Sequence, residues 1–181
     1  MADPQSGVIS WYSPDPRAII PIETYSPSRT LRRTIRRGLF RVTLNSAFCD
    51  VIRGCAARDD TWISAEIIEA YGRLHERGYA HSVEAWKEDR LAGGLYGVAL
   101  GGAFFGESMF SRVSEASKVA FAYLVERLRR RGYILLDTQF INDHVRQFGA
   151  IEVSRTRYLE MLVRALDVHT SLASGDKSDA L

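Results

Sequence analysis

The chain has 181 residues, of which 46% are hydrophobic and 25% are charged. This is the composition of a globular protein that can bury one substantial core, so we expect one compact folded unit. No apolar run approaches the roughly 20 residues that a membrane span requires, and the first thirty residues lack the pattern of a signal peptide. These features argue against membrane and secreted classes and predict a cytoplasmic protein.

Charge is unevenly distributed along the chain. The net charge of +2 indicates no partner by itself, because 24 basic residues nearly balance 22 acidic ones. Between Arg29 and Arg41, however, there are six arginines and no acidic residue, which gives a local positive field. A polyanion is the natural partner for this segment.

The first expected helix carries most of these arginines. Ser26 followed by Pro27 is a good helix opening, and Gly38 makes a plausible stop. At 100° per residue, Leu31 and Ile35 point away from an arc of ~100° that holds four basic side chains, namely Arg29, Arg32, Arg33 and Arg36. The stripe either grips a nucleic-acid backbone through forked guanidinium donors or is a solvated helix face, and charge alone leaves both open.

Two more helices are expected before the pattern changes. The first runs from near Asn45 to Ala57, and the second starts after Ser64 and ends at Gly78. The two cysteines, Cys49 and Cys55, fall in the first of these helices and point to different faces, so a disulfide between them is not expected. We expect both to be buried thiols.

The second half of the chain is expected to form a sheet with helices against it. Three runs of β-like pattern predict an antiparallel meander over 79–87, 91–100 and 103–110. A long helix (114–131), a strongly apolar strand (133–138), a short helix (142–148), a brief strand (151–153) and a helix (155–168) follow. This order predicts an α+β fold. Residues 1–9 and 170–181 are too poor in apolar groups to pack, and we expect them to be loose ends.

Two carboxylates are candidates for chemistry. Glu107 lies at the end of a glycine-studded strand, and strand alternation is expected to send it to the same face as Met109. Asp137 follows three apolar residues near the end of another strand and is expected to share a face with Gln139, where it could accept a proton or orient an amine. The structural alternatives are a solvent-facing Glu107 and a loop-capping Asp137. The Asn142-Asp143-His144 segment is interpreted as a helix N-cap.

Several familiar sites are missing from the sequence. The four histidines lack metal-ligand spacing, and there is no Walker loop, GxGxxG sequence or CxxC pair. The sequence therefore predicts neither a metal nor another cofactor.

Eight short segments, in this order along the chain, give a resemblance to the leucyl/phenylalanyl-tRNA–protein transferase family. They are WYSPDPR (11–17), SR (28–29), TWI (61–63), HSVE (81–84), GGLYG (93–97), GESMFS (106–111), ASK (116–118) and LDTQ (136–139). Each segment alone is weak, but eight at similar spacing are very specific. The similarity runs from about Trp11 to Leu162.

The resemblance implies an acetyltransferase-like α+β fold, a mixed sheet flanked by helices. It divides the chain into a reduced N-terminal segment with the arginine helix (1–44), a catalytic domain (45–169) and a disordered tail (170–181). It implies transfer of Leu, Phe or Met from aminoacyl-tRNA to an N-terminal Arg or Lys, which marks the acceptor protein for degradation by the N-end rule. The aminoacyl ester is already activated, so no cofactor is implied. A monomer is the default expectation.

Roles for individual residues also follow from the resemblance. Asp137 and Gln139 would be the reaction-centre pair, and Glu107 would position the incoming N-terminus. Trp62 would stack on the terminal adenine of the tRNA, with Arg29, Arg33 and Arg36 on its phosphates. The pocket for the transferred side chain would be lined by Leu95, Phe104, Met109, Leu124, Leu128 and Leu136.

Two departures from the family pattern bear on these expectations. The chain starts almost at WYSPDPR, whereas typical members have a further N-terminal segment of several tens of residues. Leu124 and Leu128 stand where aromatic pocket residues are expected, which predicts a roomier pocket. The alternatives are the same chemistry on a small amine or peptide acceptor, a non-catalytic tRNA-binding relative and, less favoured, an acyl-CoA acetyltransferase.

Overall fold

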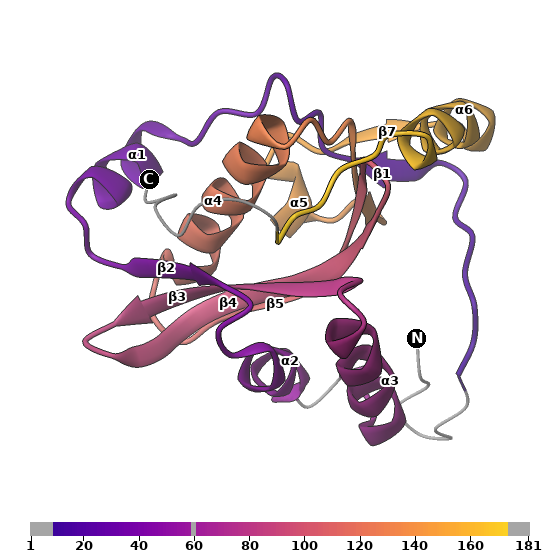
Figure 1. The fold of residues 1–181 in the computed structure, drawn as a ribbon. Coiled ribbons are helices and arrows are strands. Elements are labelled where there is room, and N and C mark those ends of the chain that lie inside the picture. Colours follow the sequence, from indigo (N-terminus) through magenta and orange to yellow (C-terminus); the bar gives the residue numbers. More distant parts are fainter. Residues whose placement is uncertain (1–8, 59–60, 174–181) are drawn as a thin grey trace.

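A computed structural model of the chain describes residues 9–58 and 61–173. In these residues seven strands form one mixed sheet in the order β2-β3-β4-β5-β6-β1-β7 (Figure 1). The strands are β1 (Arg17–Ile19), β2 (Arg41–Leu44), β3 (Ala80–Lys87), β4 (Arg90–Leu100), β5 (Ala103–Ser111), β6 (Leu135–Gln139) and β7 (Ile151–Val153). The β5–β6 pair is parallel and the other neighbours are antiparallel. The expected meander is thus confirmed as β3, β4 and β5.

Six helices cover the two faces of this sheet in the described part of the chain (Figure 1). They are α1 (Arg29–Arg36), α2 (Phe48–Ala56), α3 (Ala65–Glu76), α4 (Ala116–Arg130), α5 (Asp143–Arg146) and α6 (Arg155–Leu166). The largest cluster of buried side chains packs α4 onto one face through Leu124 and Leu128. Helices α2 and α3 pack on the opposite face around Tyr96, and α6 packs against Ala103 and Leu135. None of these helices has the length and apolar character needed to cross a bilayer.

Helix α1 lies on α4 and presents its arginines outward. Its Leu31 is buried against Val119 and Ala122 of α4, while Arg29, Arg32, Arg33 and Arg36 are exposed. The basic stripe expected from the sequence is therefore present. The predicted start was two residues early, because the Ser28 hydroxyl, and not that of Ser26, caps the helix by accepting from the Leu31 N–H at 3.2 Å.

Two strands were not expected from the sequence. Strand β1 has three residues, too few to show an alternating pattern, and β2 precedes Asn45, whose φ of +57° interrupts the chain before α2 begins at Phe48. Both strands lie in the expected reduced N-terminal segment (1–44). They belong to the same sheet as the rest of the described chain.

Two further expectations are corrected. Leu172 is 1% exposed and its carbonyl accepts from Arg127 Nε at 2.8 Å, so the expected loose end does not begin at Thr170. An apolar side chain of this size packs when the core leaves room for it, which composition alone does not reveal; residues 174–181 lie outside the described chain. Cys49 is exposed and only Cys55 is buried, because α2 turns one face to solvent.

Candidate active site

The site is organised by a gap between the two parallel strands. Strand β5 pairs with β6 only over Ala103–Phe105, opposite Leu135–Asp137. From Gly106 onward, β5 keeps β4 as its neighbour and diverges from β6. Ligands in open sheets bind at the carboxyl ends of such strands, where the neighbouring backbones separate.

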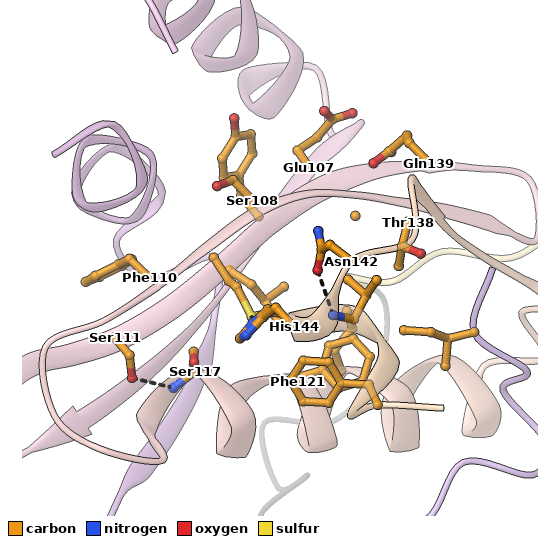
Figure 2. Close-up of a pocket in the computed structure, with 18 of the residues that line it drawn as sticks. Glu107, Ser108, Phe110, Ser111, Ser117, Phe121, Thr138, Gln139, Asn142 and His144 are labelled. Carbon is orange, nitrogen blue, oxygen red and sulfur yellow. Dashed lines mark hydrogen bonds between the residues drawn. The ribbon is translucent and has the colours of Figure 1, made fainter. Parts of the chain in front are cut away.

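On the α4 side of the sheet the gap opens into an apolar cavity of about 490 Å³. Its walls include Leu95 and Met109 from the meander, Phe121 and Leu124 from α4, and Leu136 from β6. Figure 2 shows Phe121 below the strands, with His144 and Asn142 above it. The apolar part of this lining suits an uncharged side chain such as that of leucine or phenylalanine.

A second cavity, of about 480 Å³, opens on the opposite side of the sheet, between α3 and β1. Aromatic residues dominate its lining through Trp11, Tyr12, Tyr71 and Phe105. The two cavities share five residues at the gap: Trp62, Glu107, Thr138, Gln139 and Asn142. The gap therefore connects an apolar cavity with an aromatic one.

Irregular backbone aims Glu107 at the gap. The β4–β5 register shifts there, pairing Gly97 with Gly106 but Tyr96 with Ser108, so Glu107 is an extra residue in the strand. Such a bulge re-aims side chains. The expected sharing of one face by Glu107 and Met109 is therefore wrong: Met109 packs with the α4 cluster, whereas Glu107 lines both cavities and points the same way as Ser108 (Figure 2).

Glu107 is poised to change charge near neutral pH. Burial, helped by the charge of Asp137, raises the pKa of its carboxyl to about 7, although a hydrogen bond with Tyr71 and the charge of Arg17 oppose the rise. A carboxyl group with this pKa at a gap between two cavities is typical of functional sites.

Asp137 is completely buried and its oxygens are fully engaged. Arg17 donates from Nη2 at 2.7 Å and from Nε at 3.1 Å, and the Tyr158 hydroxyl donates at 2.7 Å. The Gln139 backbone N–H donates to Oδ1 at 2.8 Å. Because Asp137 lines neither cavity, its contact with a ligand would be indirect, through Arg17 or Gln139.

Gln139 lines both cavities at the end of β6. Its φ of +61° is in the left-handed region, which is uncommon for a residue with a side chain. The alternation of β6 ends there, so Asp137 and Gln139 do not share a face as expected. The bond from its N–H to Asp137 holds this conformation.

The structure places the other expected site residues as follows. Leu95, Met109, Leu124 and Leu136 line the apolar cavity, and Trp62 lies at the gap. Phe104 and Leu128 line neither cavity, because both are fully buried in the core cluster that packs α4 onto the sheet. Arg29, Arg33 and Arg36 lie on α1, outside both cavities.

Sequence reasoning missed four residues of the site. Arg17 belongs to the WYSPDPR segment, which indicated the family but no role for this residue. Tyr158, Tyr71 and Arg58 belong to no segment that indicated a site. Tyr158 is brought to Asp137 by the packing of α6, and Tyr71 to Glu107 by that of α3. Asn142 caps α5 as expected, accepting from the Val145 N–H at 2.9 Å, and it also lines both cavities.

Comparison with known proteins identifies the family. Residues 19–163 match the model of the family described as leucyl/phenylalanyl-tRNA protein transferase. Proteins named leucyl/phenylalanyl-tRNA–protein transferase are similar to the chain: that of Salinibacter ruber is 54% identical, covering 93% of this chain and 74% of its own length. That of Gloeobacter violaceus is 55% identical, covering 92% and 86%. The chain therefore belongs to the leucyl/phenylalanyl-tRNA protein transferase family and is an aminoacyltransferase.

A solved structure shares the fold. It is titled "The structure of L-PGS from Bacillus licheniformis" and matches with a TM-score of 0.50 at 11% identity, covering 86% of this chain and 66% of that one. At this identity the likeness concerns the arrangement of the sheet and helices alone.

Replacing Arg17 by alanine should destabilise the protein strongly. The variant leaves the Asp137 carboxylate buried without its charged partner, a change that typically costs about 3–5 kcal/mol. The free energy of unfolding in urea measures the effect. In the matched control, Arg73→Ala, an exposed pair with Glu69 is lost, and the cost should stay below about 1 kcal/mol. Equal losses in the two variants would contradict the structural role of Arg17.

Proposed function

We propose that this aminoacyltransferase moves Leu, Phe or Met from aminoacyl-tRNA to the N-terminal Arg or Lys of acceptor proteins, which marks them for degradation by the N-end rule. One observation carries the proposal: an apolar cavity and an acid-bearing aromatic cavity meet at a single gap in the sheet. Two different substrates can thus approach one reaction centre from opposite faces. Because both substrates are cytoplasmic, the enzyme works in the cytoplasm. It works as a monomer, and its fold is acetyltransferase-like.

The apolar cavity receives the side chain of the transferred amino acid. Leu95, Met109, Leu124 and Leu136 form an apolar part of its wall, away from Glu107 and Arg58, and none of these four can pair with a charge. Charged side chains are therefore excluded by the cost of desolvation. Apolar side chains of similar size are separated poorly, because one methylene changes binding by only about 1–3 kcal/mol. Acceptance of Leu, Phe and Met together follows from this lining.

The tRNA extends from the gap over the outside of the protein. The terminal adenine stacks on Trp62, an arrangement worth about 1–3 kcal/mol in nucleic-acid binding proteins. Arg29, Arg33 and Arg36, all exposed on α1, contact phosphates further along the acceptor arm.

The acceptor enters from the aromatic cavity. Its cationic N-terminal side chain meets the Glu107 carboxylate and the rings of Trp11, Tyr12 and Tyr71, all of which attract cations. This surface would not favour a neutral residue at the acceptor terminus.

The reaction needs little beyond alignment of these two substrates. The neutral α-amine attacks the ester carbonyl carbon, a C–N bond forms, the C–O bond to the ribose breaks, and the amine proton passes to the departing ribose oxygen, which leaves as a hydroxyl. Gln139, fixed by its N–H bond to Asp137, holds the attacking amine through its side-chain oxygen. Holding two reactants in line supplies much of the acceleration in such transfers.

Transfer from leucyl-tRNA and phenylalanyl-tRNA to a peptide that starts with Arg tests the proposal. The wild-type protein should form the extended peptide, and both Asp137→Ala and Gln139→Ala should reduce the rate by about 10²-fold or more. Gln139 is only partly buried, so its variant should still unfold cooperatively. Tight tRNA binding without transfer would contradict the proposal and favour the non-catalytic relative. Transfer to small amines but not to the Arg peptide would favour the other acceptor class.

The pH dependence of the reaction should report Glu107. With a pKa of about 7, the carboxyl is mostly protonated at pH 6 and mostly ionised at pH 8, and only the ionised form pairs with the acceptor cation. The ratio of kcat/KM between wild type and Glu107→Gln should therefore rise about tenfold across this range with the Arg peptide. A peptide that starts with Gln should show a flat ratio. A flat ratio with the Arg peptide as well would show that Glu107 does not bind the acceptor.

A further inference from the structure

Arg58 supplies a positive charge to the wall of the cavity on the α4 side, which also carries the Glu107 carboxyl and several neutral polar side chains. It is the one Arg or Lys among the described residues that line the cavity on the α4 side. It lies just beyond the end of α2, four residues before Trp62, which lines the same cavity. The cation and the proposed adenine platform thus occupy one short stretch of chain.

The guanidinium group of Arg58 is held in place but retains donors. Its Nε donates to the Cys55 carbonyl oxygen at 3.3 Å, and its Nη2 donates to the Ser108 hydroxyl at 3.1 Å. Ser108 lies beside Glu107 on β5, at the bulge that faces the gap (Figure 2). Arginine has five N–H donors, so two bonds leave three for a ligand. Within the described part of the chain, these two bonds of Arg58 go to neutral oxygens and not to a carboxylate.

A cation at this place suits neither the transferred side chain nor the acceptor terminus, the two groups already assigned to the gap. The transferred side chain is apolar, and the acceptor terminus is itself positive, so Arg58 would repel it. The remaining part of the donor is anionic: the terminal ribose, which carries the ester, is joined at its 5′ oxygen to a phosphate. A fixed guanidinium fork is well matched to phosphate oxygens.

We propose that Arg58, anchored by Ser108 and the Cys55 carbonyl, binds the 5′-phosphate of the terminal nucleotide of the donor tRNA. The inference rests on the proposed function, because it takes the donor ester to lie in the gap with its adenine on Trp62. It assigns Arg58 a task distinct from that of the α1 arginines. They hold the acceptor arm at a distance from the cavity, whereas Arg58 fixes the one nucleotide that carries the reacting ester.

Two small analogues test this contact without any transfer reaction. They are adenosine carrying phenylalanine at its 3′ position through an unreactive amide, and the same compound with a 5′-phosphate. Calorimetric titration should give the wild-type protein a Kd about tenfold lower for the phosphorylated analogue, the usual gain from a charge-assisted contact. In Arg58→Ala this preference should vanish while the affinity for the unphosphorylated analogue changes less than about twofold. Arg58→Lys should keep part of the preference, because it retains the charge but not the fork.

Arg53→Ala is the matched control, since Arg53 lies on α2 five residues before Arg58, its side chain is 68% exposed and it pairs only weakly with Asp50 at 3.9 Å. It should leave the preference intact. A preference for the phosphorylated analogue that survives Arg58→Ala would overturn the proposal. An equal loss of affinity for both analogues would also overturn it, by showing that Arg58 merely holds Ser108 in place. Failure of transfer from phenylalanyl-tRNA would refute the proposed function but would not alter this binding comparison.

Discussion

The buried Asp137 carboxylate is the interaction on which the site depends. It joins three elements that are distant in the chain, through Arg17 of β1, Tyr158 of α6 and the backbone of Gln139 at the end of β6. A carboxylate without solvent is tolerated only when it is paired and hydrogen-bonded. The same bonds that satisfy it therefore fix the end of β6, and with it the conformation of Gln139 at the gap.

The gap itself comes from irregularities at the same level of two neighbouring strands. Strand β5 carries its bulge at Glu107, and the pairing of β1 with β6 shifts between Ala18 and Ile19, opposite Gln139 and Asp137. Regular pairing would have closed the sheet and separated its faces. Because regular pairing is interrupted here on both β5 and β6, a cavity suited to an apolar side chain and one suited to a cation communicate directly. That connection is what a reaction between two bulky substrates requires.

Much of this could be predicted from the sequence, and the remainder has identifiable causes. The meander, the α4 helix and the basic stripe of α1 follow from periodicity, which local side chains determine. That Glu107 and Asp137 lie on strands was also evident, although Glu107 lies in the middle of β5 and not at its end as expected. Their directions were not, because a bulge and a left-handed residue break the alternation on which direction was based. Arg17 and Tyr158 meet Asp137 only through tertiary packing, which leaves no local pattern.

The central claim is that the aminoacyl ester lies in the gap between β5 and β6, beside Gln139. A crystal structure of the protein with the unreactive phenylalanyl amide of adenosine tests it most directly. The account predicts the phenyl ring among Leu95, Met109 and Leu124, the adenine on Trp62 and the amide carbonyl within hydrogen-bonding reach of the gap. An analogue bound elsewhere, with the apolar cavity empty, would contradict it.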